Sequence, residues 1–488
     1  MGISTFSLGG DPRSVPPTPH RRLRTALPLL VAAGSLAWSA ALIHRYPVMY
    51  WYDPYGRVVA RDHLLVDRWL PLLQLVIFGV GKLTTDVTAL RLVLAALSAG
   101  TLVACSSLGQ RLATYSAGLL FATLMASNSL FVALSIVPYQ EVLFIGLIFA
   151  GLSFHQPPTN RPRGWMAAIA FNLACLTRYE AWILVAVLAV AELVEITRRS
   201  GVGPGLRAAA GLAVRYGGAA IGWLIFARVL APETTLLRQG APAERIADFL
   251  HQIRWQVGNL GLFPLAGLGL ALSLARAERR RSHCIILSFL IGDLGLIFFA
   301  NPFSPGNLRS TFLPVVFVLL YAAIGADLAV DEVLRRARRR VDGQAKLIAT
   351  SVLAALLAMV FVRDAARFVG TAANGFDFRV PFEVARRLET VPSALRGRAR
   401  IAMLGENYVD RLVISAYTGI PFERIVPVAG DLPADATQVI DIQRPGAILS
   451  SAAQNVRRHL EDGLIPANAV RIESAVIWTL AAPGPRAD

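Results

Sequence analysis

Charged residues are scarce in this chain. They make up 16% of its 488 residues, whereas hydrophobic residues make up 55%. A water-soluble domain carries about 25% charged residues and hides most of its large apolar side chains, so this composition excludes a soluble globular protein. The apolar residues form long segments separated by short polar loops, which is the pattern of a polytopic α-helical membrane protein.

Lysine is almost absent, and Lys82 and Lys346 are the only two. The formal net charge of +16 therefore comes from arginines, which gather in short loops between the apolar segments. Such clustering is typical of membrane topology and argues against a nucleic-acid partner.

Cysteine and histidine are also rare. Cys105, Cys175 and Cys284 lie in or beside apolar segments without metal-like spacing, which argues against a disulfide framework or a zinc site and favours buried thiols. His44 and His63 share one loop, but no partner accompanies them at metal-ligand spacing. We expect no metal that is held by protein ligands alone.

The N-terminal residues 1–25 form a tail rich in Pro, Ser, Gly and Arg. The apolar run that follows, from Ala26 to Ile43, has a cleavable signal peptide as its alternative interpretation. It is longer than the apolar core of such a peptide, which has about 7 to 15 residues. We therefore predict a retained first span and a cytoplasmic tail.

The apolar segments predict about eleven transmembrane helices in a domain of residues 26–362. The stretch from Trp69 to Val80 is too short to cross and contains Pro71, so we expect it to lie at the membrane interface or dip into it. The predicted spans are 26–43, 88–108, 113–131, 139–154, 164–178, 180–196, 208–230, 256–275, 283–300, 310–328 and 346–362.

The arginine-rich loops predict the orientation of these spans. The N-terminus and the basic loops fall on one side, which is cytoplasmic by the positive-inside rule. The other side then holds the first loop from His44 to Asp86 and the later polar segments at 135–141, 177–180, 231–255 and 301–310. The unusual polar clusters therefore share the outer face.

Residues 363–488 have a different composition. Short apolar runs at 400–404, 438–442 and 475–480 alternate with helix-like stretches near 408–417 and 450–460. This alternation predicts a small periplasmic α/β domain. We expect it to cover or gate the outer face of the membrane domain.

Two carboxylates near the outer face are candidate catalytic residues. Asp53 can take the proton of an acceptor hydroxyl, although an Asp before Pro is equally suited to cap a helix. Glu141 begins an apolar span, where a carboxylate is costly and indicates function, although it would also stabilise a helix dipole. Asp62 and Asp67 do not share a helical face, which favours solvated pairs with neighbouring arginines.

Candidate substrate-binding residues surround these acids. Tyr55 belongs to an aromatic run just outside the first span, where a lipid-linked head group would be met. Arg178, Tyr179 and Glu180 occupy a turn with almost no loop, and Arg178 suits bidentate recognition of a phosphate while Tyr179 packs against a prenyl chain or sugar. The alternative is an Arg–Glu pair in a tight turn. Arg309 is a second phosphate candidate, with a snorkelling anchor as its alternative.

The order of these motifs resembles the GT-C superfamily of membrane glycosyltransferases, in particular the protein O-mannosyltransferase and lipid A aminoarabinose transferase type. The resemblance covers residues 26–362. It rests on a first-loop acid followed by Trp-Leu-Pro, an acid after a Pro, a Leu-Thr-Arg-Tyr-Glu-Ala-Trp turn and a late Arg before Leu-Pro.

The resemblance implies transfer of a sugar, with inversion, from a polyprenyl phosphate carrier on the outer face. Asp53 would then be the general base, and the turn at 178–180 and Arg309 would bind the carrier phosphate. The family often has an Asp-Glu pair in the first loop, whereas this chain has Asp53-Pro54. That departure leaves open whether Glu141 supplies the second carboxylate.

We therefore predict an inverting glycosyltransferase of a bacterial inner membrane, with a cytoplasmic N-terminus and a periplasmic C-terminal domain. Its donor is a polyprenyl-phosphate sugar, and its acceptor is a lipid, a glycan or a protein. No cofactor is certain from the sequence, although Asp53 and Glu141 could share a divalent cation with a phosphate.

Two other classes remain as alternatives. A flippase or transporter would place ionisable groups near mid-membrane and often shows repeated halves. A non-catalytic lipid-binding subunit would use its C-terminal tail to recruit a partner. The concentration of charge on one face favours the enzyme.

Overall fold

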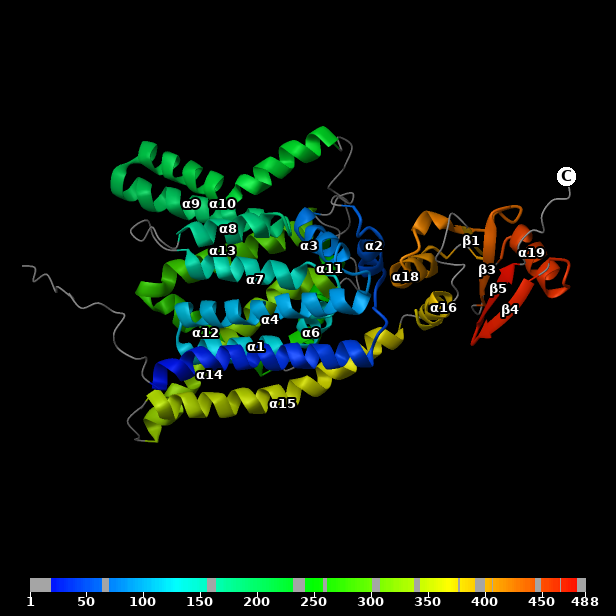
Figure 1. The fold of residues 1–488 in the computed structure, drawn as a ribbon. Coiled ribbons are helices and arrows are strands. Elements are labelled where there is room, and N and C mark those ends of the chain that lie inside the picture. The colour runs from blue at the N-terminus through cyan, green and yellow to red at the C-terminus, as the bar shows by residue number, and fades with distance from the viewer. Residues whose placement is uncertain are drawn as a thin grey trace, which may run out of the picture.

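The computed structural model describes residues 19–63, 70–155, 164–230, 242–257, 261–300, 308–337, 343–375, 378–390, 400–405, 407–443, 449–465 and 467–480. Within them a long helical bundle is followed by a small α/β domain that lies at one end of the bundle (Figure 1). Asp67, residues 231–241 of the predicted outer segment 231–255, and residues 301–307 of the segment 301–310 lie outside the described residues.

The bundle begins with α1 (Pro19–Arg45), α2 (Tyr52–Val59), α3 (Pro71–Gly81), α4 (Val87–Leu112), α5 (Tyr115–Ser127), α6 (Ser129–Ser135), α7 (Glu141–Phe154) and α8 (Gly164–Cys175). It continues with α9 (Glu180–Ser200), α10 (Val202–Leu230), α11 (Pro242–Val257), α12 (Leu262–Ala275) and α13 (Ala277–Gly295). A π-helical turn η2 (Leu296–Ala300) and a 3-10 turn η3 (Leu308–Thr311) precede α14 (Phe312–Arg336) and α15 (Gly343–Gly375).

Helices of membrane-spanning length confirm the polytopic class. In the described part of the chain six helices are long and apolar enough to cross a membrane, or eight if each of two bent pairs forms one span. The predicted count of about eleven is not confirmed, because α7 and α8 are apolar but have only 14 and 12 residues. The predicted boundary at residue 363 falls inside α15.

The short helices α7 and α8 adjoin buried turns whose backbone groups form hydrogen bonds with other parts of the protein. The turn before α7 is fully buried at Ile136 and Val137, and the carbonyl of Ile136 accepts from Nε of buried Arg91 at 2.8 Å. The carbonyl of Leu176, after α8, accepts from the backbone N–H of Leu72 at 2.9 Å. Non-helical backbone is tolerated at membrane depth only when protein groups satisfy it in this way.

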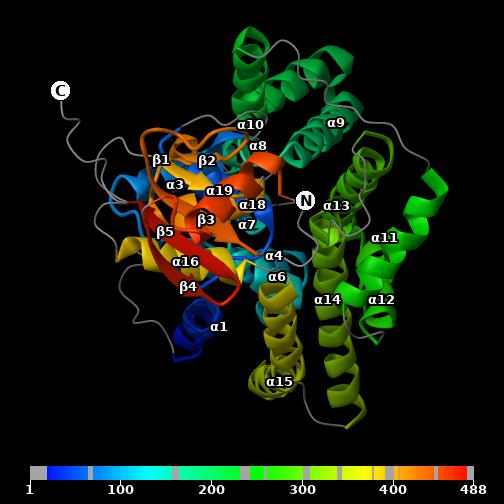
Figure 2. The ribbon, with the colours of Figure 1, turned by 90° about the vertical axis from the view of Figure 1, so that its right-hand side faces the viewer.

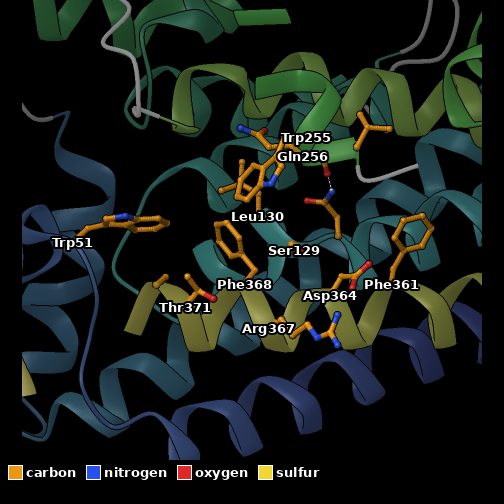
Figure 3. Close-up of a pocket in the computed structure, with 13 residues that line it drawn as sticks. Trp51, Ser129, Leu130, Trp255, Gln256, Phe361, Asp364, Arg367, Phe368 and Thr371 are labelled. Atoms are coloured by element: carbon orange, nitrogen blue, oxygen red, sulfur yellow. Dashed lines mark hydrogen bonds between the residues drawn. The ribbon is translucent and has the colours of Figure 1, made fainter. Parts of the chain in front are cut away.

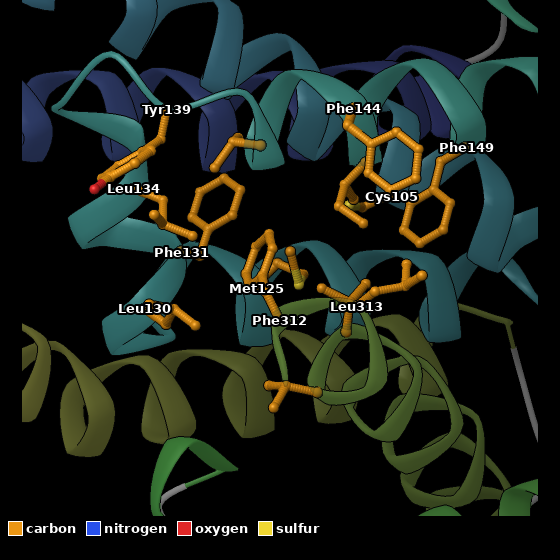
Figure 4. Packing of buried hydrophobic residues seen from close by; sticks show 14 of the residues in the cluster. Cys105, Met125, Leu130, Phe131, Leu134, Tyr139, Phe144, Phe149, Phe312 and Leu313 are labelled. Atoms are coloured by element: carbon orange, nitrogen blue, oxygen red, sulfur yellow. The ribbon is translucent and has the colours of Figure 1, made fainter. Parts of the chain in front are cut away.

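One predicted span is broken. The segment 113–131 forms α5 and the start of α6, which meet at 69°. Asn128 causes the break, because its side chain accepts from the N–H of Phe131 at 3.0 Å and so starts a new helix. In Figure 4 Phe131 and Leu134 of α6 pack beside Met125 of α5 and Phe312 of α14, within one continuous apolar core.

The C-terminal domain contains both helices and a sheet, as predicted, and its helices cover both faces of the sheet. Its sheet has the order β2 (Ile425–Pro427), β1 (Arg400–Met403), β3 (Ala436–Ile442), β5 (Ala475–Leu480), β4 (Ala467–Ile472). β1 pairs in parallel with β2 and β3, and the β4–β5 hairpin adds antiparallel strands. Strand alternation sends Ile440 to the face covered by α16 (Arg379–Glu389) and α18 (Tyr408–Thr418), and Val439 to the face covered by α19 (Ser451–Glu461).

The domain sits over the end of the bundle that carries α2 and α3. α18 packs against α2, and the view along the bundle in Figure 2 shows the sheet projecting over α3 and α7 while α11 and α13 lie to its side. The predicted site residues lie at this same end.

Candidate active site

The segment that joins α1 to α2 has an unusual backbone at Trp51. Its φ of 65° and ψ of 151° fall in a region that suits glycine and costs other residues about 1–3 kcal/mol. Such strain persists only where surrounding contacts determine the conformation. Here the hydroxyl of buried Tyr50 donates to the carbonyl of Ala133 at 2.5 Å, and the Trp51 ring packs edge-on against Tyr139.

Asp53 lies in the first turn of α2, two residues after this strained residue. Its Oδ2 accepts from Nη2 of Arg309, on η3, at 2.8 Å. The Arg309 guanidinium also stacks over the ring of Tyr139, with its Cζ 4.5 Å from the ring centroid. Two elements more than 250 residues apart in sequence therefore meet in one ion pair.

Glu141 is the first residue of α7 and is buried. Its Oε1 accepts from Nη1 of Arg178, and Nη1 of Arg309 lies 3.9 Å from the same oxygen. Glu141 Oε2 is buried and, within the described structure, has no hydrogen-bond partner. Glu141 therefore links the two candidate phosphate-binding arginines through one of its two oxygens.

Arg178 bridges two carboxylates. Its Nη1 pairs with Glu141, while Nε donates to Oε1 of Glu180 at 2.9 Å and Nη2 donates to the same oxygen. Burial lowers the pKa of Arg178, but Glu180 and Glu141, helped by Asp293, outweigh burial and raise the pKa above its ordinary value. The guanidinium is therefore charged at any physiological pH.

Asp293 is a site residue that the sequence reasoning missed. It lies near the end of α13, is buried, and its Oδ2 has no hydrogen-bond partner among the described residues. A lone carboxylate inside an apolar span was the signal that could have found it. The π-helical turn η2 begins three residues later, and such turns are frequent at functional sites.

Arg57 is a second missed residue, and no sequence pattern pointed to it. It lies on α2 four residues after Asp53 and is buried, and its Nη2 donates to Oε1 of Gln140 at 3.0 Å. Burial lowers the pKa of Arg57 to about 10, against the opposing effect of Glu141 and Asp53. Arg57 therefore remains charged near neutral pH and adds a third cation to the cluster.

Two other predicted residues pack against aromatic rings. Tyr55 points toward the C-terminal domain, where its ring packs edge-on against Phe378 and Tyr417. Tyr179 packs edge-on against Trp182 of α9. Among the predicted residues, the structure brings together Asp53, Glu141, Arg178, Glu180 and Arg309. Asp62 is exposed and pairs with Lys82 at 3.6 Å, away from the cluster.

A cavity of about 610 Å³ begins at Trp51, beside the cluster. Figure 3 shows its aromatic walls: Trp51 at one end, Trp255 of α11 on one side, and Phe361 and Phe368 of α15 on the other. Hydrogen-bonding groups lie between these rings, namely those of Asn128, Ser129, Gln256, Asp364, Arg367 and Thr371. The mixture of aromatic and polar walls suits an amphipathic ligand.

The carboxylates of the cluster pair with arginines. Within the residues that the structure describes, no group of three His, Cys, Asp or Glu side chains can hold a metal ion.

Comparison with known proteins assigns the fold. No protein-family model and no curated protein matches the chain. The structure of ArnT from Cupriavidus metallidurans bound to undecaprenyl phosphate aligns with a TM-score of 0.59 at 14% identity and covers 95% of this chain and 99% of that chain. The oligosaccharyltransferase of Archaeoglobus fulgidus, in complex with zinc and sulfate, aligns with a TM-score of 0.50 at 12% identity and covers 84% and 67%. The chain thus has the fold of the GT-C membrane glycosyltransferases, as its motifs predict.

Proposed function

We propose that the protein is an inverting glycosyltransferase that moves a sugar from a polyprenyl phosphate to an acceptor hydroxyl. The observation that carries this proposal is the pairing of Asp53 with Arg309 and of Glu141 with Arg178 at one end of a GT-C fold. A general base and phosphate-binding cations are the groups that such a transfer needs. The undecaprenyl phosphate bound to ArnT supports a donor of this class.

Donor binding would change the Asp53–Arg309 pair. A phosphate is a strong partner for a guanidinium, so it competes with Asp53 for Arg309. The displaced Asp53 carboxylate then accepts the proton of the acceptor hydroxyl as that oxygen attacks the anomeric carbon. The bond from this carbon to the phosphate oxygen breaks on the opposite face, and the electron pair leaves with the phosphate. The sugar inverts in this single displacement.

The deeper residues would orient the reacting groups. Arg178 and Arg309 stabilise the charge that develops on the departing phosphate. Glu141 Oε2 and Asp293 Oδ2, which are buried acceptors, take hydrogen bonds from sugar or acceptor hydroxyls. The cavity beside Trp51 holds part of an amphipathic substrate, with its aromatic walls against the sugar or lipid.

We place the site on the outer face of a bacterial inner membrane. The support is the distribution of arginines: the basic loops lie at the opposite ends of the spans from the cluster, and positive loops face the cytoplasm. The N-terminus is then cytoplasmic and the C-terminal domain is periplasmic.

The test is transfer from a panel of radiolabelled undecaprenyl-phosphate hexoses and pentoses by purified protein in liposomes. Asp53→Asn removes the base and should lower kcat by about 10²- to 10⁴-fold. Asp62→Asn, the same change at an exposed acid of the same loop, should leave transfer unchanged. Full activity of Asp53→Asn would refute the role of Asp53, and translocation of intact donor without sugar release would indicate a flippase.

A further inference from the structure

We propose that the C-terminal domain completes the active site, and that Tyr417 of α18 is a positioning residue for Asp53. Tyr417 touches no reacting group. It holds the segment 46–51, which sets where α2 begins and hence where Asp53 meets Arg309. The proposal rests on the proposed function for the role of Asp53, whereas the contacts that carry it are independent of that function.

The Tyr417 hydroxyl bonds the segment twice. It donates to the carbonyl of Pro47 at 2.8 Å and accepts from the N–H of Met49 at 3.0 Å. The carbonyl of Met49 in turn accepts from the hydroxyl of Tyr55, on α2, at 2.6 Å. A chain of hydrogen bonds therefore runs from α18 through the segment to the helix that carries Asp53.

The membrane domain holds the same segment from the other side. Nη1 of Arg91, on α4, donates to the carbonyls of Tyr46 and Pro47 at 2.9 and 2.8 Å. The carbonyl of Pro47 is thus shared between Arg91 and Tyr417. The segment lies between a fixed helix of the bundle and a helix of the C-terminal domain, and both sides are needed to fix it.

The backbone strain at Trp51 explains why hydrogen bonds from both Arg91 and Tyr417 are required. A non-glycine residue with φ of 65° relaxes unless its neighbours prevent it. Trp51 follows the clamped residues and immediately precedes α2, so relaxation there would turn α2 and move Asp53 relative to Arg309. Tyr417 therefore opposes a motion that the backbone itself favours.

Apolar packing keeps α18 in place for this task. Leu412, Val413 and Ala416 of α18 belong to the same apolar core as the membrane helices, whereas Ile414 faces the core of the sheet. The Tyr417 ring packs against Phe382, with 4.7 Å between ring centroids, as well as against Tyr55. Because the ring has its own contacts, removal of the hydroxyl alone should leave the domain docked.

The experiment is hydrogen exchange of the full-length protein in detergent, comparing Tyr417→Phe with wild type. Tyr408→Phe is the matched control, because it makes the same change at an exposed position of the same helix. We expect exchange in peptides covering residues 46–52 to rise at least about threefold in Tyr417→Phe only, since the Met49 N–H loses its acceptor. Unchanged protection of β3 shows that the domain is folded.

A kinetic readout separates positioning from general stability. With the donor that supports transfer, kcat of Tyr417→Phe should fall about tenfold, because a small misplacement of a catalytic group is costly. The KM for the donor should not rise, because Arg178 and Arg309 lie on other segments and a displaced Asp53 competes less with the donor phosphate for Arg309. If wild type shows no transfer, the proposed function fails. The exchange result still tests whether Tyr417 holds the segment 46–51. Equal exchange of residues 46–52 in all three proteins, or faster exchange with unchanged kcat, would overturn the proposal.

Discussion

Replacement of Arg178 by Gln tests the deepest part of the cluster. Arg178 is the shared cation of Glu141 and Glu180, and all three side chains are largely buried. Removal of one partner from a buried ion pair costs about 3–5 kcal/mol. Proton uptake limits this loss, because protonation of a glutamate of ordinary pKa, about 4.3, costs about 3.7 kcal/mol at pH 7.

We therefore expect Arg178→Gln to lower the free energy of unfolding by about 3–4 kcal/mol at pH 7. The folded variant binds a proton that the unfolded chain lacks at this pH, so its stability rises as the pH falls. At pH 5 the same protonation costs about 1 kcal/mol, and most of the deficit should disappear. The double variant Arg178→Gln with Glu141→Gln should recover much of the loss at pH 7.

The assay is equilibrium unfolding in mixed micelles at pH 7 and pH 5. Arg335→Gln is the control, since Arg335 is exposed and pairs with Glu332 on the surface of α14. Such a pair contributes about 0–1 kcal/mol. A deficit of Arg178→Gln as small as that of the control, or one that is equal at both pH values, would refute the reasoning.

Two further predictions, one on helix packing and one on a buried ion pair, use the same unfolding assay. Gly269→Ala on α12 should destabilise the protein by about 1–3 kcal/mol, because a Cβ there would lie 2.1 Å from the carbonyl oxygen of Tyr321 on α14. Gly267→Ala on the same helix, where a Cβ has open space, should be neutral or slightly stabilising. Lys346→Met should lower the free energy of unfolding by about 3–5 kcal/mol, because Lys346 lies 3.0 Å from the buried carboxylate of Asp327. A smaller loss in the double variant with Asp327→Asn would confirm the pairing. An unchanged stability of Lys346→Met would contradict it.

The sequence predicts the elements well because their signals are local. Long apolar runs predict most of the bundle, and short apolar runs separated by helix-like stretches predict β1, β3, β5, α18 and α19. The helix break at Asn128 was missed because this capping residue lies inside an apolar run that reads as one continuous span. Strands β2 and β4 were also missed, since β2 has only three residues and most of β4 is not buried.

The candidate site is predictable only in part, because side-chain direction depends on the fold. Asp53 and Tyr55 are two residues apart on a helix and so point about 200° apart. One therefore faces Arg309 and the other faces the C-terminal domain, although the sequence presents them as one aromatic and acidic run. Arg57 follows four residues after Asp53 on the same face, but its value as a buried cation depends on Gln140 and Glu141, which the chain brings from another helix.

Exposure divides the cluster into a fixed part and an exchangeable part. The side chains of Arg178 and Glu141 are 16% and 3% exposed, whereas those of Arg309 and Asp53 are 28% and 22% exposed. An incoming anion therefore meets Arg309 first, and it needs to displace only the better-solvated carboxylate. Displacement of Glu141 would leave a buried charge without its cation, which is far more costly. The inner pair is thus suited to hold the geometry of the site, and in the proposed transfer the outer pair would exchange a carboxylate for a phosphate.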